Sequence, residues 1–142
     1  MGGKKVTGRK RHLAVDTLGH LLTVLVTPAD VPDVDGAYET LPAAKAVAPT
    51  LQHVFVDGGY EGDWAEWAAE EHQVTVEVVR RPPGTRGFVV QARRWVVERT
   101  FAWFGRNRRL SRDVEVYEQT TETLIYLASC HLLLKRLYPA SQ

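Results

Sequence analysis

The hydrophobic and polar positions near the start of the chain predict two strands and then a helix. Residues 12–16 and 20–27 are rich in β-branched and apolar side chains, and the Asp-Thr-Leu-Gly run at 16–19 is typical of a turn. Together they indicate a β-hairpin. A stretch punctuated by prolines follows, and residues 36–48 then favour a helix, although Pro42 disfavours its first turns.

Strand-like and helical patterns alternate along the rest of the chain. Residues 51–60 are a short apolar run that ends in Asp-Gly-Gly, and residues 62–72 place two tryptophans and an alanine on one helical face. Residues 74–80 alternate like a strand and precede a Pro-Pro-Gly run. Two more helices are predicted, one over residues 91–108 and a largely buried one over residues 120–138.

The predicted order of elements is β-β-α-β-α-β-α-α in a single domain, residues 1–142. A hairpin followed by helices that alternate with strands indicates a mixed sheet with helices packed against it. The sequence therefore predicts an α/β fold.

Charge is strongly segregated along the chain, although the net charge is only +1. Residues 1–12 carry five basic side chains and no acid, whereas residues 13–79 carry twelve acids and one lysine. Residues 80–112 carry ten arginines and a single acid, Glu98. Because the guanidinium group matches the oxygens of a phosphate, this block favours nucleic-acid binding; a solvated cationic surface is the alternative.

Composition excludes several classes of protein. The chain is 44% hydrophobic and 25% charged, as globular domains are. No apolar run reaches the roughly 18 residues that a membrane span needs. Its one cysteine, Cys130, excludes an intramolecular disulfide and a cysteine-rich zinc site. We expect a soluble, cytoplasmic protein without a membrane partner.

Asp57 is the first candidate for chemistry, because it ends a predicted apolar strand and precedes Gly58 and Gly59. Ligands of open α/β sheets bind outside the carboxyl ends of the strands, and paired glycines leave room for a phosphate beside the carboxylate. A turn aspartate that accepts hydrogen bonds from local amides is the alternative.

Glu98 is the second candidate, on the helix predicted over residues 91–108. It shares a helix face with the small residues Ala102 and Gly105, and Arg94 and Arg109 lie at the ends of that face. The opposite face, predicted to meet the core, comprises Val97, Thr100, Phe101 and Phe104. Two carboxylates on a strand end and a helix suit Mg²⁺, and two such ions serve phosphoryl transfer. An i,i+4 pair between Glu98 and Arg94 is the alternative.

Three stretches of the chain resemble one known family. GRKRHLAVDTLG, FVDGGYEG and especially RRWVVERTFAWFGRNRRL are similar to the catalytic domain of bacterial insertion-sequence transposases of the DDE type, in the insertion-sequence four/five class. The similarity covers about residues 4–137. It implies an RNase H-like fold and a homo-oligomeric enzyme that cuts and joins double-stranded DNA at transposon ends, using two Mg²⁺ ions.

The resemblance also implies roles for individual residues. Asp57 matches the family's second catalytic aspartate and Glu98 its glutamate, so both would bind the metal. Arg94 matches the arginine of the family's Tyr-Arg-Glu-Lys signature, whereas Gln91 and Gly105 stand where its tyrosine and lysine are expected. The residues expected to contact DNA are Arg94, Arg99, Arg106, Arg108, Arg109, Lys10 and Arg11.

The family's first catalytic aspartate, and the strand that carries it, have no counterpart in this sequence. Asp16 is the nearest substitute, but it falls in the predicted hairpin turn. In an RNase H-like sheet the missing strand is central, between the hairpin and the Asp57 strand, so its loss would leave unpaired edges and a gap in the core. We therefore expect a catalytically inactive fragment: a decayed gene, or the second half of a transposase encoded in two frames.

Two other functions stay open at this point. One is a non-catalytic remnant that binds DNA or pairs with subunits of an intact transposase. The other is an unrelated Mg²⁺-dependent nuclease that uses Asp57 and Glu98 with a third, unidentified ligand.

Overall fold

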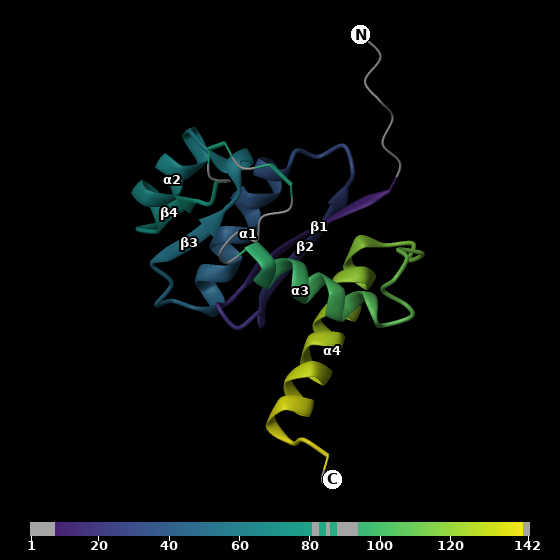
Figure 1. Cartoon of the computed structure of the whole chain (residues 1–142). Coiled ribbons are helices and arrows are strands. Elements are labelled where there is room, and N and C mark those ends of the chain that lie inside the picture. Colours follow the sequence, from purple (N-terminus) through teal and green to yellow (C-terminus); the bar gives the residue numbers. More distant parts are fainter. Residues whose placement is uncertain (1–7, 81–82, 85, 88–93, 141–142) are drawn as a thin grey trace.

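The computed structural model describes residues 8–80, 83–84, 86–87 and 94–140 (Figure 1). The elements in that part of the chain are β1 (Arg9–Val15), β2 (Leu21–Pro28), α1 (Asp33–Val47), β3 (His53–Val56), the 3-10 turn η1 (Gly58–Tyr60), α2 (Asp63–His72), β4 (Thr75–Val78), α3 (Arg94–Gly105) and α4 (Glu118–Leu137). Apart from η1, this is the predicted order, and it confirms the α/β class. None of the described helices is long and apolar enough to cross a membrane.

The predicted hairpin is present, and its first strand begins three residues earlier than the sequence indicated. β1 pairs antiparallel with β2, with Leu13 opposite Val24, and a bulge lies between Ala14 and Val15. The turn closes where the Gly19 amide donates to the Asp16 carbonyl at 3.0 Å.

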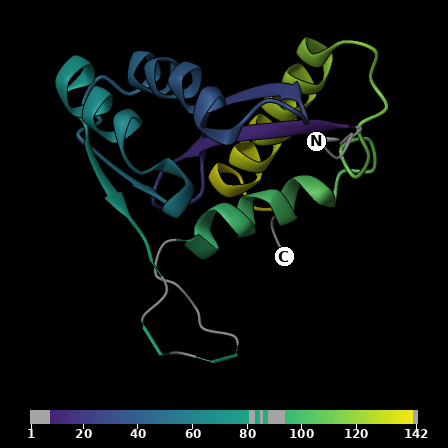
Figure 2. The same cartoon turned by 90° about the horizontal axis from the view of Figure 1, so that it is seen from above.

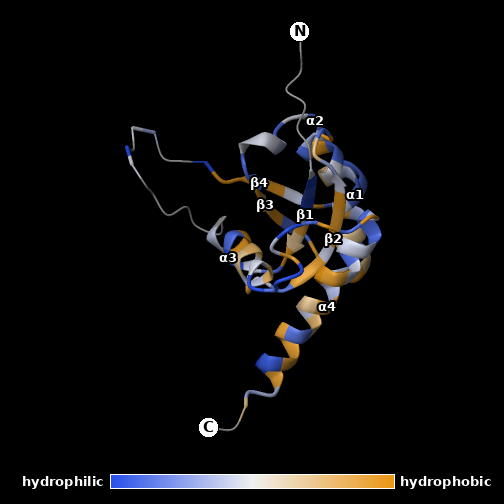
Figure 3. Cartoon of the chain, turned by 90° about the vertical axis from the view of Figure 1, so that its right-hand side faces the viewer, coloured by the Kyte–Doolittle hydropathy of each residue, from blue (hydrophilic) through white to orange (hydrophobic). Residues whose placement is uncertain are grey.

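The four strands do not form one mixed sheet. Among the described residues, β1 pairs only with β2 and β3 pairs in parallel with β4, which gives two two-stranded sheets. The two pairs lie beside each other (Figures 1 and 3). The prediction of a single sheet is therefore wrong for this part of the chain, because no strand bridges β1 and β3 by backbone hydrogen bonds.

Two hydrophobic clusters hold the helices against the strands. The first joins β2 to α3 and α4 and consists of Val24, Val26, Phe104, Leu110 and Ile125. The second joins α1 and α2 to β3 and β4 and consists of Ala37, Leu41, Trp64, Ala68 and Val74. Helix α1 also packs on β1 and β2, so it links both clusters. In Figure 2, α1 and α2 lie on one side of the strands and α3 on the other.

Helix α3 ends earlier than predicted. Its last residue is Gly105, and the chain then turns, with the Asn107 amide donating to the Phe104 carbonyl at 2.9 Å. Arg109 therefore lies outside the helix rather than at the end of the Glu98 face. The first three residues of the predicted helix, 91–93, lie outside the described residues.

The core-facing side of α3 is rotated relative to the prediction. Val96, Thr100 and Phe104 are buried, whereas Phe101 is 38% exposed. The reason is the hairpin turn, since the Thr100 hydroxyl donates to the Gly19 carbonyl at 2.8 Å and so fixes which face meets the strands.

Helix α4 is far more exposed than predicted. Only Thr121, Ile125 and Ser129 are buried along it, and Leu137 is 72% exposed. Its C-terminal half extends away from the other elements (Figures 1 and 3). The prediction of a largely buried helix is wrong because apolar residues surround α4, while only one of its faces meets β2 and α3.

Candidate functional site

Asp57 lies immediately after β3, at the start of η1. Its backbone is extended, and its Oδ1 accepts a hydrogen bond from the Gly59 amide at 2.9 Å. The side chain is exposed, and a methyl group built on Gly58 would meet nothing within 4 Å. Asp57 thus bonds a local amide, as turn aspartates do, and its carboxylate lies close to Gly59, where an added Cβ would be 3.2 Å from Oδ1.

Tyr60 anchors the turn that carries Asp57. Its amide donates to the Asp57 carbonyl at 3.3 Å, and its ring meets the Trp64 ring edge-on at a centroid distance of 5.7 Å. Burial, with smaller effects of the Asp33 and Asp57 carboxylates, raises the pKa of Tyr60 to about 12. The Tyr60 phenol is therefore neutral at physiological pH.

Glu98 is exposed on α3, and so are Ala102 and Gly105, the small residues predicted to share its face. A Cβ at Gly105 would meet nothing within 4 Å. Arg94 is the first residue of α3, and its side chain lies outside the described part of the structure.

Asp57 and Glu98 provide carboxylate oxygens, the ligand type that Mg²⁺ prefers. The described residues nevertheless contain no group of three or more His, Cys, Asp or Glu side chains that could hold a metal ion. The two acids are therefore ligands of the right kind but not a complete two-metal set. No catalytic step follows from them alone.

The Asp16 carboxylate is engaged within the hairpin turn. Its Oδ1 accepts from the amides of Leu18 and His20, each at 2.9 Å, and its Oδ2 lies 3.0 Å from His20 Nδ1. These three contacts all lie within the hairpin turn, where the sequence predicted Asp16 to be.

Arg99 forms part of a stack of aromatic and guanidinium groups on α3. Its guanidinium lies 4.4 Å from the Trp95 ring centroid and 4.7 Å from that of Trp103, and Arg136 covers Trp103 at 4.4 Å. Arg99 Nη2 also donates to the Leu18 carbonyl at 2.8 Å. The stack holds α3 and α4 against the hairpin turn, through cation–π contacts worth about 0.5–2 kcal/mol each.

Other candidate DNA-binding residues differ in how far they are engaged. Lys10 Nζ donates to the Val31 carbonyl at 2.8 Å and pairs with Asp33 at 3.0 Å. Arg109 pairs with Glu115 at 2.7 Å, and this hydrogen bond lowers the pKa of Glu115. Three candidates have no ion-pair partner within the described part of the chain: Arg11 in β1, and Arg106 and Arg108 beyond α3.

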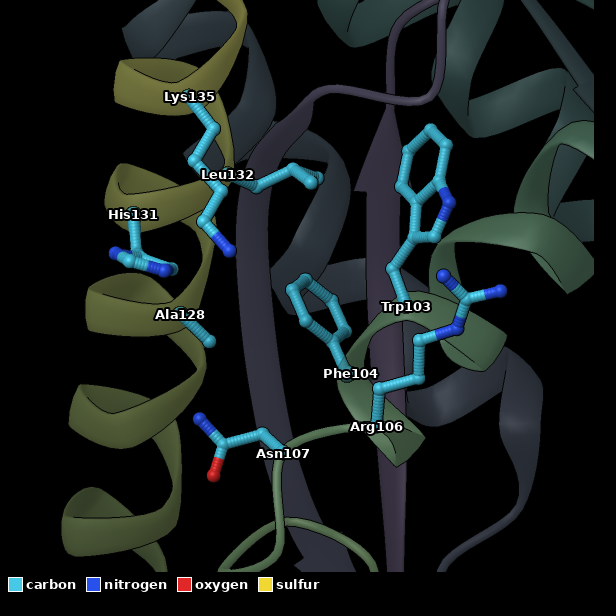
Figure 4. A pocket seen from close by; sticks show the side chains of 8 residues that line it. All are labelled: Trp103, Phe104, Arg106, Asn107, Ala128, His131, Leu132 and Lys135. Atoms are coloured by element: carbon cyan, nitrogen blue, oxygen red, sulfur yellow. The ribbon is translucent and has the colours of Figure 1, made fainter. Parts of the chain in front are cut away.

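A hollow lies between the end of α3 and one face of α4 (Figure 4). Its lining residues are Trp103, Phe104, Arg106, Asn107, Ala128, His131, Leu132 and Lys135. Only Arg106 among them is a functional candidate from the sequence. The signal that could have found the others is the spacing of His131 and Lys135, which places both on one face of a helix.

Comparison with known proteins identifies the family. A family model described as the transposase DDE domain matches residues 1–133. The chain is 29% identical over 145 aligned residues to a Burkholderia cepacia protein named "Putative transposase for insertion sequence element IS402", and the alignment covers 95% of this chain and 67% of that protein. No solved structure matches the chain. The extent of the family match shows that the chain belongs to the DDE transposase family.

Proposed function

We propose that this chain supplies part of the catalytic domain of a DDE transposase of the insertion-sequence four/five class, and that it acts on double-stranded DNA. The observation that carries the proposal is the placement of Asp57, exposed at the carboxyl end of β3. Glu98, exposed on α3, is the catalytic glutamate in this proposal. Both are acids that the family's catalytic chemistry requires.

The two separate sheets support an RNase H-like arrangement that one more strand would complete. The outer edge of β2 is covered, since the amides of Val24 and Val26 donate to Tyr126 Oη at 3.2 Å and Glu122 Oε1 at 2.8 Å. Among the described residues, β1 and β3 have no such cover on the edges away from their partner strands. A strand between them would join the pairs into one mixed sheet, and in our proposal a separately encoded N-terminal segment supplies it.

Asp57 and Glu98 would hold Mg²⁺ together with a third acid from that segment. When bound, the metal supplies charge stabilisation for the attacking and leaving oxygens of a phosphodiester. The residues of this chain would position the metal. Without the third ligand the metal would be held weakly, so the chain alone is inactive, and the completed enzyme acts as a homo-oligomer at transposon ends.

Strand cleavage tests this proposal. We expect no Mg²⁺-dependent cleavage of transposon-end DNA by the chain alone, and cleavage after co-expression with the segment encoded upstream. In that complex, Asp57→Ala or Glu98→Ala should each reduce the rate by more than the roughly 10–100-fold typical of losing a group that only supports a metal ligand. Glu66→Ala, which removes an exposed acid of α2, is the matched control and should leave the rate unchanged.

Other outcomes would separate the alternatives. Cleavage by the chain alone, regardless of end sequence, would indicate a nuclease and contradict the proposal. DNA binding that survives both substitutions, with no cleavage in any combination, would indicate a non-catalytic remnant instead.

A further inference from the structure

The hollow between α3 and α4 is cationic on two of its sides. Arg106 approaches from the turn after α3, and His131 and Lys135 project from α4. Figure 4 shows Lys135 and Asn107 in the space between α4 and Phe104, whereas the Arg106 guanidinium lies on the other side of Phe104, toward Trp103. The hollow has a volume of about 480 Å³, which is within the usual range of ligand pockets.

No acid lines this hollow. Within the described part of the chain, Arg106, His131 and Lys135 also have no ion-pair partner elsewhere. Arg109, two residues after Asn107, differs because Glu115 already neutralises it. The positive charge facing the hollow is therefore uncompensated by the protein.

The floor of the hollow is apolar. Phe104 is buried beneath it, and Leu132 and Ala128 form the side contributed by α4. Apolar walls lower the local dielectric constant, so a cation–anion contact there is stronger than on an open surface. Asn107 adds an amide donor, and Arg106 adds positive charge.

We propose that this hollow binds a backbone phosphate of DNA, held by Lys135 with His131 and Asn107 as further donors, while Arg106 contributes positive charge from the other side of Phe104. The inference rests on the proposed function, since a DNA substrate is what makes a phosphate the expected anion. Arg108 and Arg112 are exposed on the turn that leaves the hollow, so a DNA strand could continue along cationic side chains. The hollow uses α4 residues that the sequence analysis did not assign to DNA.

Binding of a short DNA duplex of arbitrary sequence, measured by fluorescence anisotropy at several salt concentrations, tests the proposal. The Arg106→Gln/Lys135→Gln variant should bind about tenfold more weakly, and the slope of log affinity against log salt should fall by about 1. The matched control is Lys45→Gln/Arg80→Gln, which removes the same charge far from the hollow, where Lys45 bonds the Leu51 carbonyl and Arg80 pairs with Glu61. It should bind almost as the unmodified chain does. Thermal unfolding of each variant establishes that it is folded.

A second measurement needs no substitution in the hollow. In NMR spectra, the ring resonances of His131 should shift on addition of the duplex, whereas those of His72, packed against Trp67 in α2, should not. Shifts with duplex but not with inorganic phosphate at the same ionic strength would identify DNA rather than a small phosphate as the ligand.

The outcomes distinguish this inference from the proposed function. If the unmodified chain binds the duplex and the Arg106/Lys135 variant binds equally well, the hollow is not a phosphate site, although the transposase proposal stands. If the unmodified chain does not bind duplex even at low salt, the proposed DNA function of this chain is contradicted. That result would overturn the DNA-phosphate site as well, and a His131 shift with inorganic phosphate alone would indicate a small-anion site instead.

Discussion

Gly19 and Gly62 have nearly the same positive φ, +85° and +84°, but very different surroundings. A Cβ on Gly19 would lie 2.9 Å from Thr100 Oγ1 and 3.2 Å from the Trp103 ring, whereas a Cβ on Gly62 would meet nothing within 4 Å. Backbone conformation alone therefore favours glycine at position 62. At position 19 the close approach of α3 adds a second requirement.

The matched pair Gly19→Ala and Gly62→Ala measures that approach. Both variants should lose stability because an alanine disfavours a positive φ. Gly19→Ala should lose about 1–3 kcal/mol more, as overpacking does. Denaturant-induced unfolding gives both values. Equal losses of unfolding free energy in the two variants would mean that α3 does not pack closely against the hairpin turn in solution.

His12 makes stability depend on pH. It is only 8% exposed, and its Nε2 lies 2.8 Å from Thr27 Oγ1. Burial lowers the pKa of His12 below 6.5, and the Asp33 carboxylate opposes this more weakly. Because the unfolded chain then binds the proton more readily, stability is full above about pH 6.5 and falls as the pH drops below it.

The comparison of the unmodified chain with His12→Gln tests this assignment. Between about pH 7.5 and pH 5 the unmodified chain should lose more unfolding free energy than the variant, since only it carries the buried imidazole. Urea unfolding at each pH provides the measurement. An identical pH dependence in both proteins would assign the effect to other groups.

At the level of elements, α1 approaches β1 closely at Gly36. A Cβ there would lie 2.5 Å from the Cε1 and Nδ1 atoms of the His12 ring. Glycine inside a helix costs roughly 0.5–1 kcal/mol relative to alanine, so the chain gives up helix stability at this position. The close packing of α1 on the hairpin is the physical reason.

Gly36→Ala should therefore destabilise the protein by about 1–3 kcal/mol, because the clash outweighs the gain in helix propensity. In a His12→Ala background the same substitution should be neutral or stabilising. Gly105→Ala, at the open end of α3, is the control and should not destabilise. The unfolding free energies of the double-mutant cycle measure the coupling between positions 36 and 12. Additive effects would refute contact between Gly36 and His12.

For the whole molecule, the important feature is which strand edges are covered. The amides of Val24 and Val26 bond to α4 side chains rather than to β1. Their partners across the ladder, Leu13 and Arg11, are therefore in non-hydrogen-bonded pairs, and their amides point away from β2. The amide of His12 points toward β2 instead.

Hydrogen exchange followed by NMR should reveal this alternation. The amides of Arg11 and Leu13 should exchange much faster than that of His12, because no described strand covers their edge. Tyr126→Phe should accelerate exchange at Val24 but not at Val26, which Glu122 still covers. Slow exchange at Arg11 and Leu13 would show that another segment already covers this edge of β1, and would remove the support for a missing strand.

The sequence by itself determined the order and type of the elements and the positions of two candidate acids on them. Helix and strand periods are local properties, because each reports which positions of one segment prefer burial. The hairpin, its Asp16 turn and the helix of Trp64 and Ala68 followed from such local patterns. So did the place of Asp57 at the end of a strand and of Glu98 on a helix face with small residues.

Only the tertiary structure decided how those elements meet. Pairing of strands, the rotation that buries Val96 instead of Phe101, and the exposure of α4 all depend on distant segments, which local periodicity does not record. The hollow lined by Arg106 and Lys135 also depends on distant segments. Its two sides are far apart along the chain and come together only when α3 and α4 pack on β2. Long-range packing, rather than the preference of any single residue, sets these features.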